Sequence, residues 1–486
     1  MVVTTVHQQE PMEWARKHFG EVDLGDLRRD QRAVEIAAGF ATHPDKSIPQ
    51  VFINPYDVKA TYGFFRRDEA TPDGLQAGHR EFVLGEMNQP GRYLLIEDTT
   101  EMAWSGKKPI PGLGPIGTGA AGLQGFHLHS TLAVGWRPEP SESETWPGRA
   151  AVEVLGLADQ QYNLREPRPE GEEKNDSKAA KRRERESQWW EQAGLNIGPA
   201  PARADVEWIR VADRGADIYE MMVSCQELNQ RFVIRAAQDR SLTDEAGRAN
   251  LGKLFETARE PEPLGAFQLE LRARPGQAAR TAQMKISAVE VYLRSPQRPG
   301  KGAGYLPPVR CTAVRVWEEN APAGVEALEW ILLTDLEVKS FEQALEVALI
   351  YSTRWLIEEF HKALKSGGTK AEDLQLETAE ALFAAIAIKS VVALRLIELR
   401  ERVRIMPEAP ATQSGLSEIE LEVLRATLNR PIKTVREVAL AIGRLGGHMN
   451  RKGDGMPGFI TLFRGMSKLN GLVEGARIGR KLKKFG

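Results

Sequence analysis

Polar side chains recur at helical spacing within the predicted helix 341–366. At 100° per residue, four of them fall within about 60° of one another: Tyr351, Arg354, Glu358 and Lys365. A core helix normally turns an apolar face inward. Arginine makes forked contacts to phosphate oxygens, lysine a point-charge contact, and tyrosine a hydroxyl or stacking contact. The face therefore predicts a phosphate partner, with a divalent metal between that phosphate and Glu358.

A divalent metal at Glu358 needs further oxygen ligands. Asp98 follows the short apolar stretch 93–96, at the end of a predicted strand. Asp213 stands in the same way at the end of the stretch 208–212. Two strand-end aspartates and a helix glutamate can hold two Mg²⁺ ions about 3.5–4 Å apart, one activating water or a 3′-hydroxyl and the other stabilising the leaving oxygen at phosphorus. The residues alone leave open whether the three acids meet.

The segments around these acids alternate between strand and helix patterns. Residues 126–134 and 151–157 are further predicted strands, which favours an α/β core. Residues 231–333 contain short strand patterns separated by Gly, Pro and Arg. We interpret them as an antiparallel β subdomain inserted into the core. The segments 165–186 and 295–308 are predicted to be an exposed charged loop and a long hairpin loop.

Residues 14–67 have helical periodicity. Asp26 is the predicted N-cap of a helix that continues through residues 32–40. Because spacings of three and four residues face alike, three arginines can share its surface: Arg28, Arg29 and Arg32. We interpret this segment as a small helical DNA-binding module, with a solvated charged face as the alternative.

Composition limits the class of protein. A chain of 486 residues typically forms roughly two to four domains. Hydrophobic residues at 42% and charged residues at 27% exclude a disordered or fibrous class. The only two cysteines, Cys225 and Cys311, are too few for a disulfide framework and are expected to be reduced core thiols. The chain shows no signal-peptide pattern, and Lys389 and Arg395 interrupt its most apolar stretch, so we expect an intracellular protein without a membrane span.

Charge is balanced overall but not along the chain. Lys and Arg number 65 and Asp and Glu number 67, which gives a formal net charge of −2. Residues 443–486, however, contain ten basic and two acidic side chains. A helical tail of this kind is typical of contact with a polyanion, nucleic acid above all. A solubilising tail is the alternative.

The polar helix face belongs to a longer motif. The string from Tyr351 to Lys365, YSTRWLIEEFHKALK, resembles the Tyr-Arg-Glu-Lys signature of the IS-four family of bacterial DDE transposases. Shorter segments resemble the family in the same order along the chain: LGDLRR at 24–29, IEDTT at 96–100, DRGAD at 213–217 and AIGRLGG at 441–447. The resemblance therefore extends over nearly the whole chain.

This resemblance implies a Mg²⁺-dependent transposase with a ribonuclease-H-like catalytic core. Asp98, Asp213 and Glu358 would be its catalytic metal ligands and would hold two Mg²⁺ ions, with Mn²⁺ as a substitute. The implied cut-and-paste reaction nicks the DNA, forms and resolves a hairpin on the transposon end, and joins that end to target DNA. The implied partners are double-stranded DNA with terminal inverted repeats, target DNA, and a second copy of the chain in a synaptic homodimer. The implied location is the bacterial cytoplasm, at the nucleoid.

The resemblance also implies DNA contacts. Three signature residues would lie near the cleaved end: Tyr351, Arg354 and Lys365. Trp330 would stack on a base flipped out during hairpin formation, although an ordinary strand aromatic is the alternative. The N-terminal arginines would be the remaining contacts: Arg28, Arg29 and Arg32. Thr42 and Gly63 replace basic residues of the most similar member of the family, which predicts that this protein reads different terminal repeats.

The predicted architecture is an α/β, ribonuclease-H-like core with an inserted antiparallel β subdomain, flanked by helical N-terminal and C-terminal domains. Residues 1–70 form the predicted DNA-binding domain. Residues 71–372 form the catalytic domain, with the β insertion at about 231–333. Residues 373–486 form the predicted dimerisation and DNA-contact domain.

Other interpretations fit parts of the sequence. A non-catalytic DNA-binding protein or a transposition inhibitor derived from a transposase would keep the basic surfaces and lose the acids, whereas all three acids are present. A glycosidase also uses paired carboxylates, but the basic face around Glu358 counts against it. His127 and His129 face the same side of a predicted strand without a third ligand, so we expect hydrogen-bonding residues near the core sheet rather than a zinc site. Residues 187–190 are the predicted start of a helix anchored by tryptophans.

Overall fold

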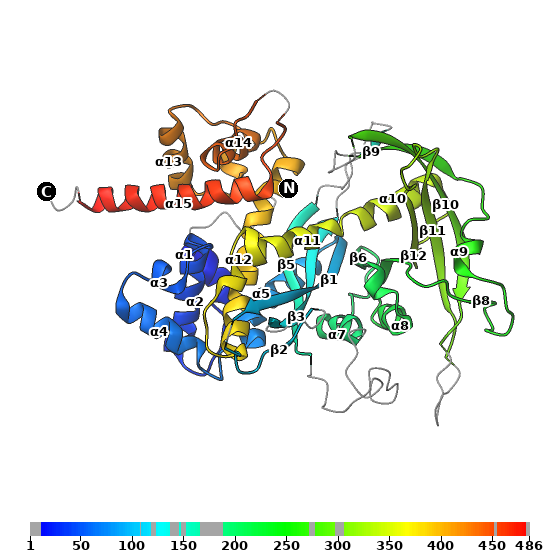
Figure 1. Cartoon of the computed structure of the whole chain (residues 1–486), viewed down its shortest axis with the longest axis horizontal. Helices are drawn as coiled ribbons and strands as arrows, with labels where there is room; N and C mark the ends of the chain where they lie inside the picture. Colours follow the sequence, from blue (N-terminus) through cyan, green and yellow to red (C-terminus); the bar gives the residue numbers. More distant parts are fainter. Residues whose placement is uncertain are drawn as a thin grey trace.

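The computed structural model describes residues 11–106, 108–117, 123–136, 145–146, 152–165, 188–271, 278–296, 306–451 and 454–482. Helices at both ends of the chain flank a central region of mixed strands and helices (Figure 1). Most of the charged loop predicted at 165–186, the tip of the hairpin loop at 295–308, and Ser187 lie outside the described residues.

The N-terminal part is helical, as predicted. Its elements are α1 (Pro11–Phe19), α2 (Leu27–Thr42), α3 (Ile48–Val51) and α4 (Pro55–Phe65), followed by α5 (Pro72–Met87). Asp26 is the N-cap of α2: its backbone is extended, and its Oδ1 accepts the Arg28 N–H at 2.8 Å. This bond satisfies one of the N–H groups that a helix start leaves without a partner. Trp14, Phe19 and Phe40 are fully buried and hold the bundle together.

The central element is one mixed sheet. Its strands follow the order β2-β3-β1-β6-β7-β12-β11-β10-β9-β4, and β5 pairs with β3. Three antiparallel strands, β5, β3 and β1, precede the parallel strands β6 and β7. The bounds in this half are β1 (Gly91–Ser105), β2 (Gly114–Pro115), β3 (Leu123–Trp136), β4 (Thr145–Trp146), β5 (Val152–Asn163), β6 (Val206–Ala212) and β7 (Arg231–Arg235).

Strand β1 is longer than the sequence predicts. We expected it to end within residues 97–100, with Asp98 at its end, but it continues to Ser105 because β3 pairs with it over residues 92–105. What ends near Asp98 is the parallel pairing with β6, whose last pair is Glu97 with Ala212. Asp98 therefore lies in the middle of a strand, at the level where its neighbour stops.

The second half of the sheet is antiparallel, as predicted for the insertion. It contains β8 (Leu242–Thr243), β9 (Gly265–Leu271), β10 (Arg280–Leu293), β11 (Val309–Glu319) and β12 (Glu329–Thr334), with α9 (Leu254–Thr257) beside them. Two details differ from the prediction. The strand β7 pairs in parallel with β6, so it belongs to the core rather than to the insertion. The strand β12 pairs with β7, so the insertion extends the core sheet and does not form a separate one.

Helices cover both faces of the sheet. The helices α7 (Gln188–Ile197) and α8 (Tyr219–Glu227) pack against each other on one side, and α10 (Phe341–Ser352) and α11 (Trp355–Lys362) cross the other (Figure 1). Trp189 and Trp190 anchor the start of α7, as predicted. Cys225 and Cys311 are buried free thiols, also as predicted.

The predicted continuous helix 341–366 is interrupted. The N–H groups of Thr353 and Arg354 bond to carbonyls three residues back, so the helix tightens between α10 and α11. The Ser352 and Thr353 hydroxyls also donate to carbonyls three residues back, at 2.7 and 2.6 Å. Such bonds compete with the regular ladder and bend helices. A π-helical turn (Ala363–Gly367) and a 3₁₀ turn (Ala371–Asp373) follow α11.

The C-terminal part consists of α12 (Ala379–Ile405), α13 (Glu418–Leu428), α14 (Val435–Leu445) and α15 (Phe459–Leu482). Helix α12 contains the most apolar stretch of the sequence and is buried along most of its length, and α15 projects beyond the body of the molecule (Figure 1). None of the described helices is both long enough and apolar enough to cross a membrane.

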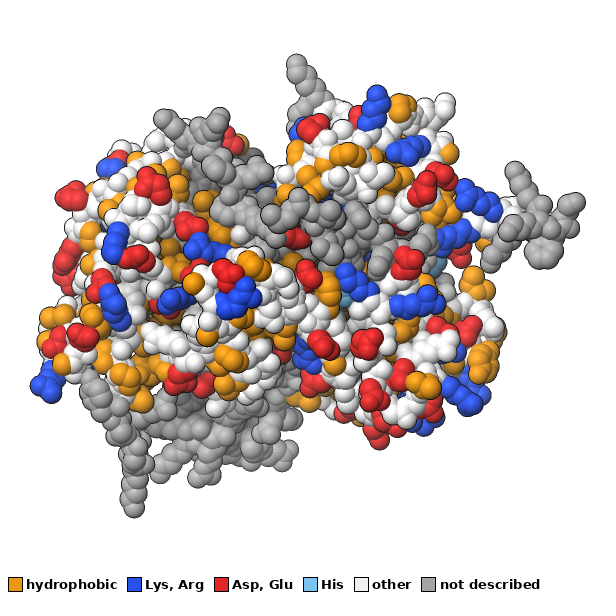
Figure 2. Space-filling model, turned by 180° about the vertical axis from the view of Figure 1, so that it is seen from behind, with side chains coloured by type: hydrophobic (Ala, Val, Ile, Leu, Met, Phe, Trp, Pro, Cys, Tyr) orange, Lys and Arg blue, Asp and Glu red, His pale blue; other side chains and the backbone are white. Residues whose placement is uncertain are grey.

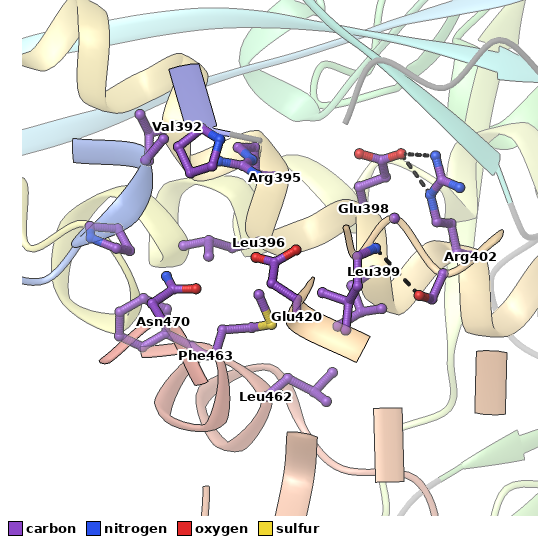
Figure 3. A pocket seen from close by; sticks show the side chains of 17 residues that line it. Val392, Arg395, Leu396, Glu398, Leu399, Arg402, Glu420, Leu462, Phe463 and Asn470 are labelled. Atoms are coloured by element: carbon purple, nitrogen blue, oxygen red, sulfur yellow. Dashed lines mark hydrogen bonds and ion pairs between the residues drawn. The ribbon is translucent and has the colours of Figure 1, made fainter. Parts of the chain in front are cut away.

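A small pocket lies where α12 and α15 meet the N-terminal helices (Figure 3). Its volume is about 60 Å³, and its walls include Leu396, Leu399 and Phe463. The ion pair of Glu398 with Arg402 borders it, with Nε 2.7 Å from Oε1. None of the three predicted catalytic acids lines the pocket.

Candidate active site

Sheet register brings Asp98 and Asp213 together. Glu97 pairs with Ala212 across the parallel strands β1 and β6, and each aspartate is the next residue in its chain. Each aspartate therefore comes directly after one member of the last β1–β6 pair, so both lie at the same end of this pairing. Because successive residues of a strand face opposite sides, both also face away from the side of Glu97. The two carboxylates lie near enough for the charge of Asp213 to help raise the pKa of Asp98.

Glu358 reaches this pair from α11. Arg354 connects the two elements: its Nη1 lies 3.2 Å from Asp98 Oδ2 and 3.2 Å from Glu358 Oε1. Glu358 is also among the charges that raise the pKa of Asp98. Residues 98, 213 and 358 therefore converge, although they are far apart in the sequence.

The electrostatics of the site are those of crowded carboxylates. Burial first, and then the charge of Asp213, raise the pKa of Asp98 to about 6, while the Thr99 N–H and Arg354 pull it the other way. Burial lowers the pKa of Arg354, but the nearby Tyr351 and the surrounding acids have the larger opposite effect, so the arginine pKa is raised overall. The cluster therefore needs a cation, and in this structure the cation is a guanidinium.

The donor set suits a hard divalent cation, because all three side chains offer carboxylate oxygens. Within the described residues, however, no three Asp, Glu, His or Cys side chains are gathered closely enough to hold a metal ion. Arg354 forms an ion pair with Asp98 and another with Glu358, each at 3.2 Å. A metal ion bound by Asp98 and Glu358 would compete with this guanidinium for their oxygens.

Lys365 lies on the π-helical turn beyond α11. Its Nζ donates to the Glu101 carbonyl of β1 at 2.6 Å and pairs with Glu372 Oε1 at 3.3 Å. The Ala103 N–H also donates to Glu372 Oε1, at 3.0 Å. Glu372 thus holds the lysine against the strand that carries Asp98. Nothing in the local sequence pairs Glu372 with that strand, so sequence reasoning missed it.

The aromatic residues considered as DNA contacts differ in exposure. Tyr351 and Trp330 are partly buried and pack against the main core cluster. Trp355 is 55% exposed, and the Arg354 guanidinium lies 5.6 Å from its ring centroid. Sequence reasoning did not single out Trp355. Its position between Arg354 and Glu358 was the available signal.

The predicted N-terminal contacts are not equally accessible. Arg28 is exposed. Arg29 donates to the Leu24 carbonyl at 2.7 Å and pairs with Glu69, and Arg32 pairs with Asp57 at 3.2 Å. Two of the three arginines therefore also stabilise their own domain.

The C-terminal basic segment is only partly described. Lys452, Lys483 and Lys484 lie outside the described residues, as does the side chain of Lys481. Several of the remaining basic residues are exposed: Arg444, Arg451, Arg464, Lys468 and Arg480. On the face shown in Figure 2, basic and acidic side chains are interspersed, so that face has no broad region of one charge.

The two histidines of β3 are buried in the core, as predicted. Thr99 Oγ1 lies 2.8 Å from His129 Nδ1, and His127 is 5% exposed. Neither belongs to a metal-binding group within the described part of the chain.

Comparison with known families identifies both ends of the chain. The family model described as Transposase DNA-binding matches residues 11–70, and the one described as Transposase Tn5 dimerisation domain matches residues 391–486. Matches to domains of these kinds support DNA and a second copy of the chain as partners. Together, the two matches support a Tn5-like transposase.

Proposed function

We propose that this transposase cleaves transposon ends and joins them to target DNA by metal-dependent phosphoryl transfer. The proposal rests above all on the convergence of Asp98, Asp213 and Glu358, with Arg354 between two of them. The mixed sheet that positions the two aspartates supports a ribonuclease-H-like core. The cut-and-paste sequence with a hairpin intermediate follows from the family resemblance and belongs to the proposal.

The three carboxylates would hold two Mg²⁺ ions, or Mn²⁺ in their place. Such ions would activate the attacking oxygen and stabilise the leaving oxygen at phosphorus. Asp98 must be deprotonated for this role. Because its pKa is about 6, it is mostly ionised at neutral pH.

The neighbouring side chains would bind the DNA. Arg354 can exchange its carboxylate partners for a phosphate, because a guanidinium forks to either group. Lys365 adds a point charge beside β1. Trp330 and the exposed Trp355 are candidates for stacking on an unpaired base, an interaction worth about 1–3 kcal/mol per base. The N-terminal helices would recognise terminal inverted repeats, and dimerisation would bring two ends together.

The direct test uses DNA carrying the ends of the element that encodes the protein. With Mg²⁺, we expect the wild type to cleave these ends and to lose activity when the metal is chelated. Asp98→Asn, Asp213→Asn and Glu358→Gln remove a charge with little change of shape and should abolish cleavage. Glu227→Gln on α8 is the matched control, because this exposed carboxylate lies outside the cluster. Full cleavage by Asp98→Asn or Glu358→Gln would reject the proposal.

The alternative is a non-catalytic binder or inhibitor derived from a transposase. Calorimetric titration with Mn²⁺ in the presence of DNA separates the two functions. An enzyme should bind the metal, and the Glu358→Gln variant should bind it more weakly. Binding of end DNA without any metal binding would favour the inhibitor.

A further inference from the structure

A fully buried ion pair lies on the rear of the sheet, opposite α11. Arg210 Nε and Nη2 donate to the two carboxylate oxygens of Glu97 at 2.5 and 2.7 Å, and neither side chain is exposed to solvent. Arg210 also donates to the Trp190 carbonyl of α7. Since Glu97 faces this side, Asp98 faces the other, where Arg354 contacts it.

This ion pair joins the two strands that carry the aspartates. Arg210 belongs to β6 and is paired in register with Leu95 of β1, whereas its side chain reaches Glu97, two residues further along. The Arg210–Glu97 ion pair therefore connects the two parallel strands diagonally. A slip of one residue would turn every side chain of a strand to the opposite face. The tie fixes the register that places Asp98 beside Asp213.

A second contact holds the residue after Asp98. Thr99 also faces the rear, and its Oγ1 lies 2.8 Å from Nδ1 of His129 on β3. The His129 ring packs edge-on against Trp190, at 4.7 Å between centroids. The Thr99 backbone N–H donates to Asp98 Oδ1 at 2.7 Å. The residues on both sides of Asp98 are thus anchored from behind, by β6 and by β3.

We infer that these four residues form a rear network that positions the catalytic aspartates: Glu97, Thr99, His129 and Arg210. The inference rests on the proposed function. None of the four is a catalytic residue, because they lie on the face of the sheet away from the reacting groups. Their effect passes through the backbone of β1 and the bond from the Thr99 N–H.

Stability alone does not account for such a network. Desolvating two charges offsets most of their attraction, so that well-packed apolar residues often serve equally well or better. What apolar residues cannot supply is a directional tie between two strands. Groups behind the ligands of a metal typically change its affinity on the order of 10–100-fold when they are removed, and we expect the rear network to act in that range.

Thr99→Val is the sharpest test, because it removes the hydroxyl that meets His129 and keeps the shape. Thr131→Val is the matched control. Thr131 is a fully buried threonine on the same sheet whose hydroxyl has no hydrogen-bond partner among the described residues. Thr99→Ser restores the hydroxyl. The readouts are Mn²⁺ binding to the protein alone, by calorimetry, and single-turnover cleavage of end DNA.

We expect Thr99→Val to weaken Mn²⁺ binding and to slow cleavage on the order of tenfold each. Thr131→Val should stay within about twofold of the wild type, and Thr99→Ser should recover most of the loss. The inference would be overturned if Thr99→Val and Thr131→Val had equal Mn²⁺ affinities and cleavage rates. It would also be overturned if Thr99→Ser bound Mn²⁺ normally but did not recover cleavage activity.

Failure of the proposed function has a different signature. If the wild type neither binds Mn²⁺ nor cleaves its own element ends, both the function and the rear network are overturned. If the wild type does both and Thr99→Val is indistinguishable from it, the rear network alone is wrong.

Discussion

Removing the Arg354 side chain should leave the charges of Asp98 and Glu358 without their cation and so destabilise the protein. Unit charges 3.2 Å apart attract each other by about 5 kcal/mol at an effective dielectric constant of about 20. Glu358 is 45% exposed, so solvent screening reduces its share to a few tenths of a kcal/mol at most. Asp98 is 17% exposed, but burial of the guanidinium offsets much of that attraction. We therefore expect Arg354→Ala to lower the free energy of unfolding by about 1–2 kcal/mol at neutral pH without divalent ions.

Saturating Mg²⁺ should reverse this loss. Without Arg354, the metal no longer has to displace a bound cation, so its affinity should rise by about tenfold, equivalent to about 1.4 kcal/mol. Mg²⁺ should then stabilise Arg354→Ala more than the wild type, by mass action on the folded state. Cleavage should nevertheless fall, because the variant loses a phosphate contact.

The assay is chemical unfolding of each protein with and without Mg²⁺. Arg354→Lys keeps the positive charge but loses the forked guanidinium. Its free energy of unfolding should lie between those of the wild type and Arg354→Ala. Arg214→Ala is the control: it removes an exposed charge next to Asp213 without breaking either Arg354 bond. If Arg354→Ala is as stable as the wild type without Mg²⁺ and gains no more from it, the proposed competition between Arg354 and metal is refuted.

Two further predictions concern acid stability and base stacking. Burial lowers the pKa of His79 and of His361 to about 3, while the unfolded chain takes up these protons below about 6.5. The contribution of these neutral histidines to stability is therefore complete above pH 6.5 and falls towards pH 3, by about 2 kcal/mol per histidine at pH 5. Unfolding in urea should show that His79→Gln loses less stability than the wild type between pH 7.5 and pH 5. An equal loss in the two proteins would contradict this reasoning. Trp355→Ala should raise the activation free energy of end cleavage by about 1–3 kcal/mol. It should cost little folding stability, since the ring is 55% exposed. Trp355→Phe should retain most activity, and unchanged cleavage by Trp355→Ala would remove this residue from the DNA contacts.

Local chemistry along the chain was sufficient to predict most elements. Asp26 caps a helix where an N-cap residue precedes a periodic run, and α12 is buried where the sequence is most apolar. Apolar stretches became strands, among them β3, β6 and β12. These features depend on neighbours a few residues away, so a single sequence carries the information.

The same reasoning was wrong where an additional hydrogen-bonding partner, distant or local, decides the outcome. β1 runs past Asp98 because β3 pairs with its whole length, and the helix before Glu358 tightens where two hydroxyls donate to its own carbonyls. β7 joins the core because β6 lies beside it. In each case a hydrogen-bonding partner extended, bent or relocated an element whose type had been predicted correctly.

The sequence alone determined which acids and bases this transposase carries, and the motif around Glu358 that marks its family. Only the tertiary structure decided that Asp213 and Glu358 lie near enough to influence Asp98, that Arg354 bridges Asp98 and Glu358, and that Arg210 connects the strands of the two aspartates on the opposite face. The physical reason is that carboxylate crowding, cation placement and strand register act through space. They depend on distances of a few ångströms between groups more than a hundred residues apart, which no local pattern contains.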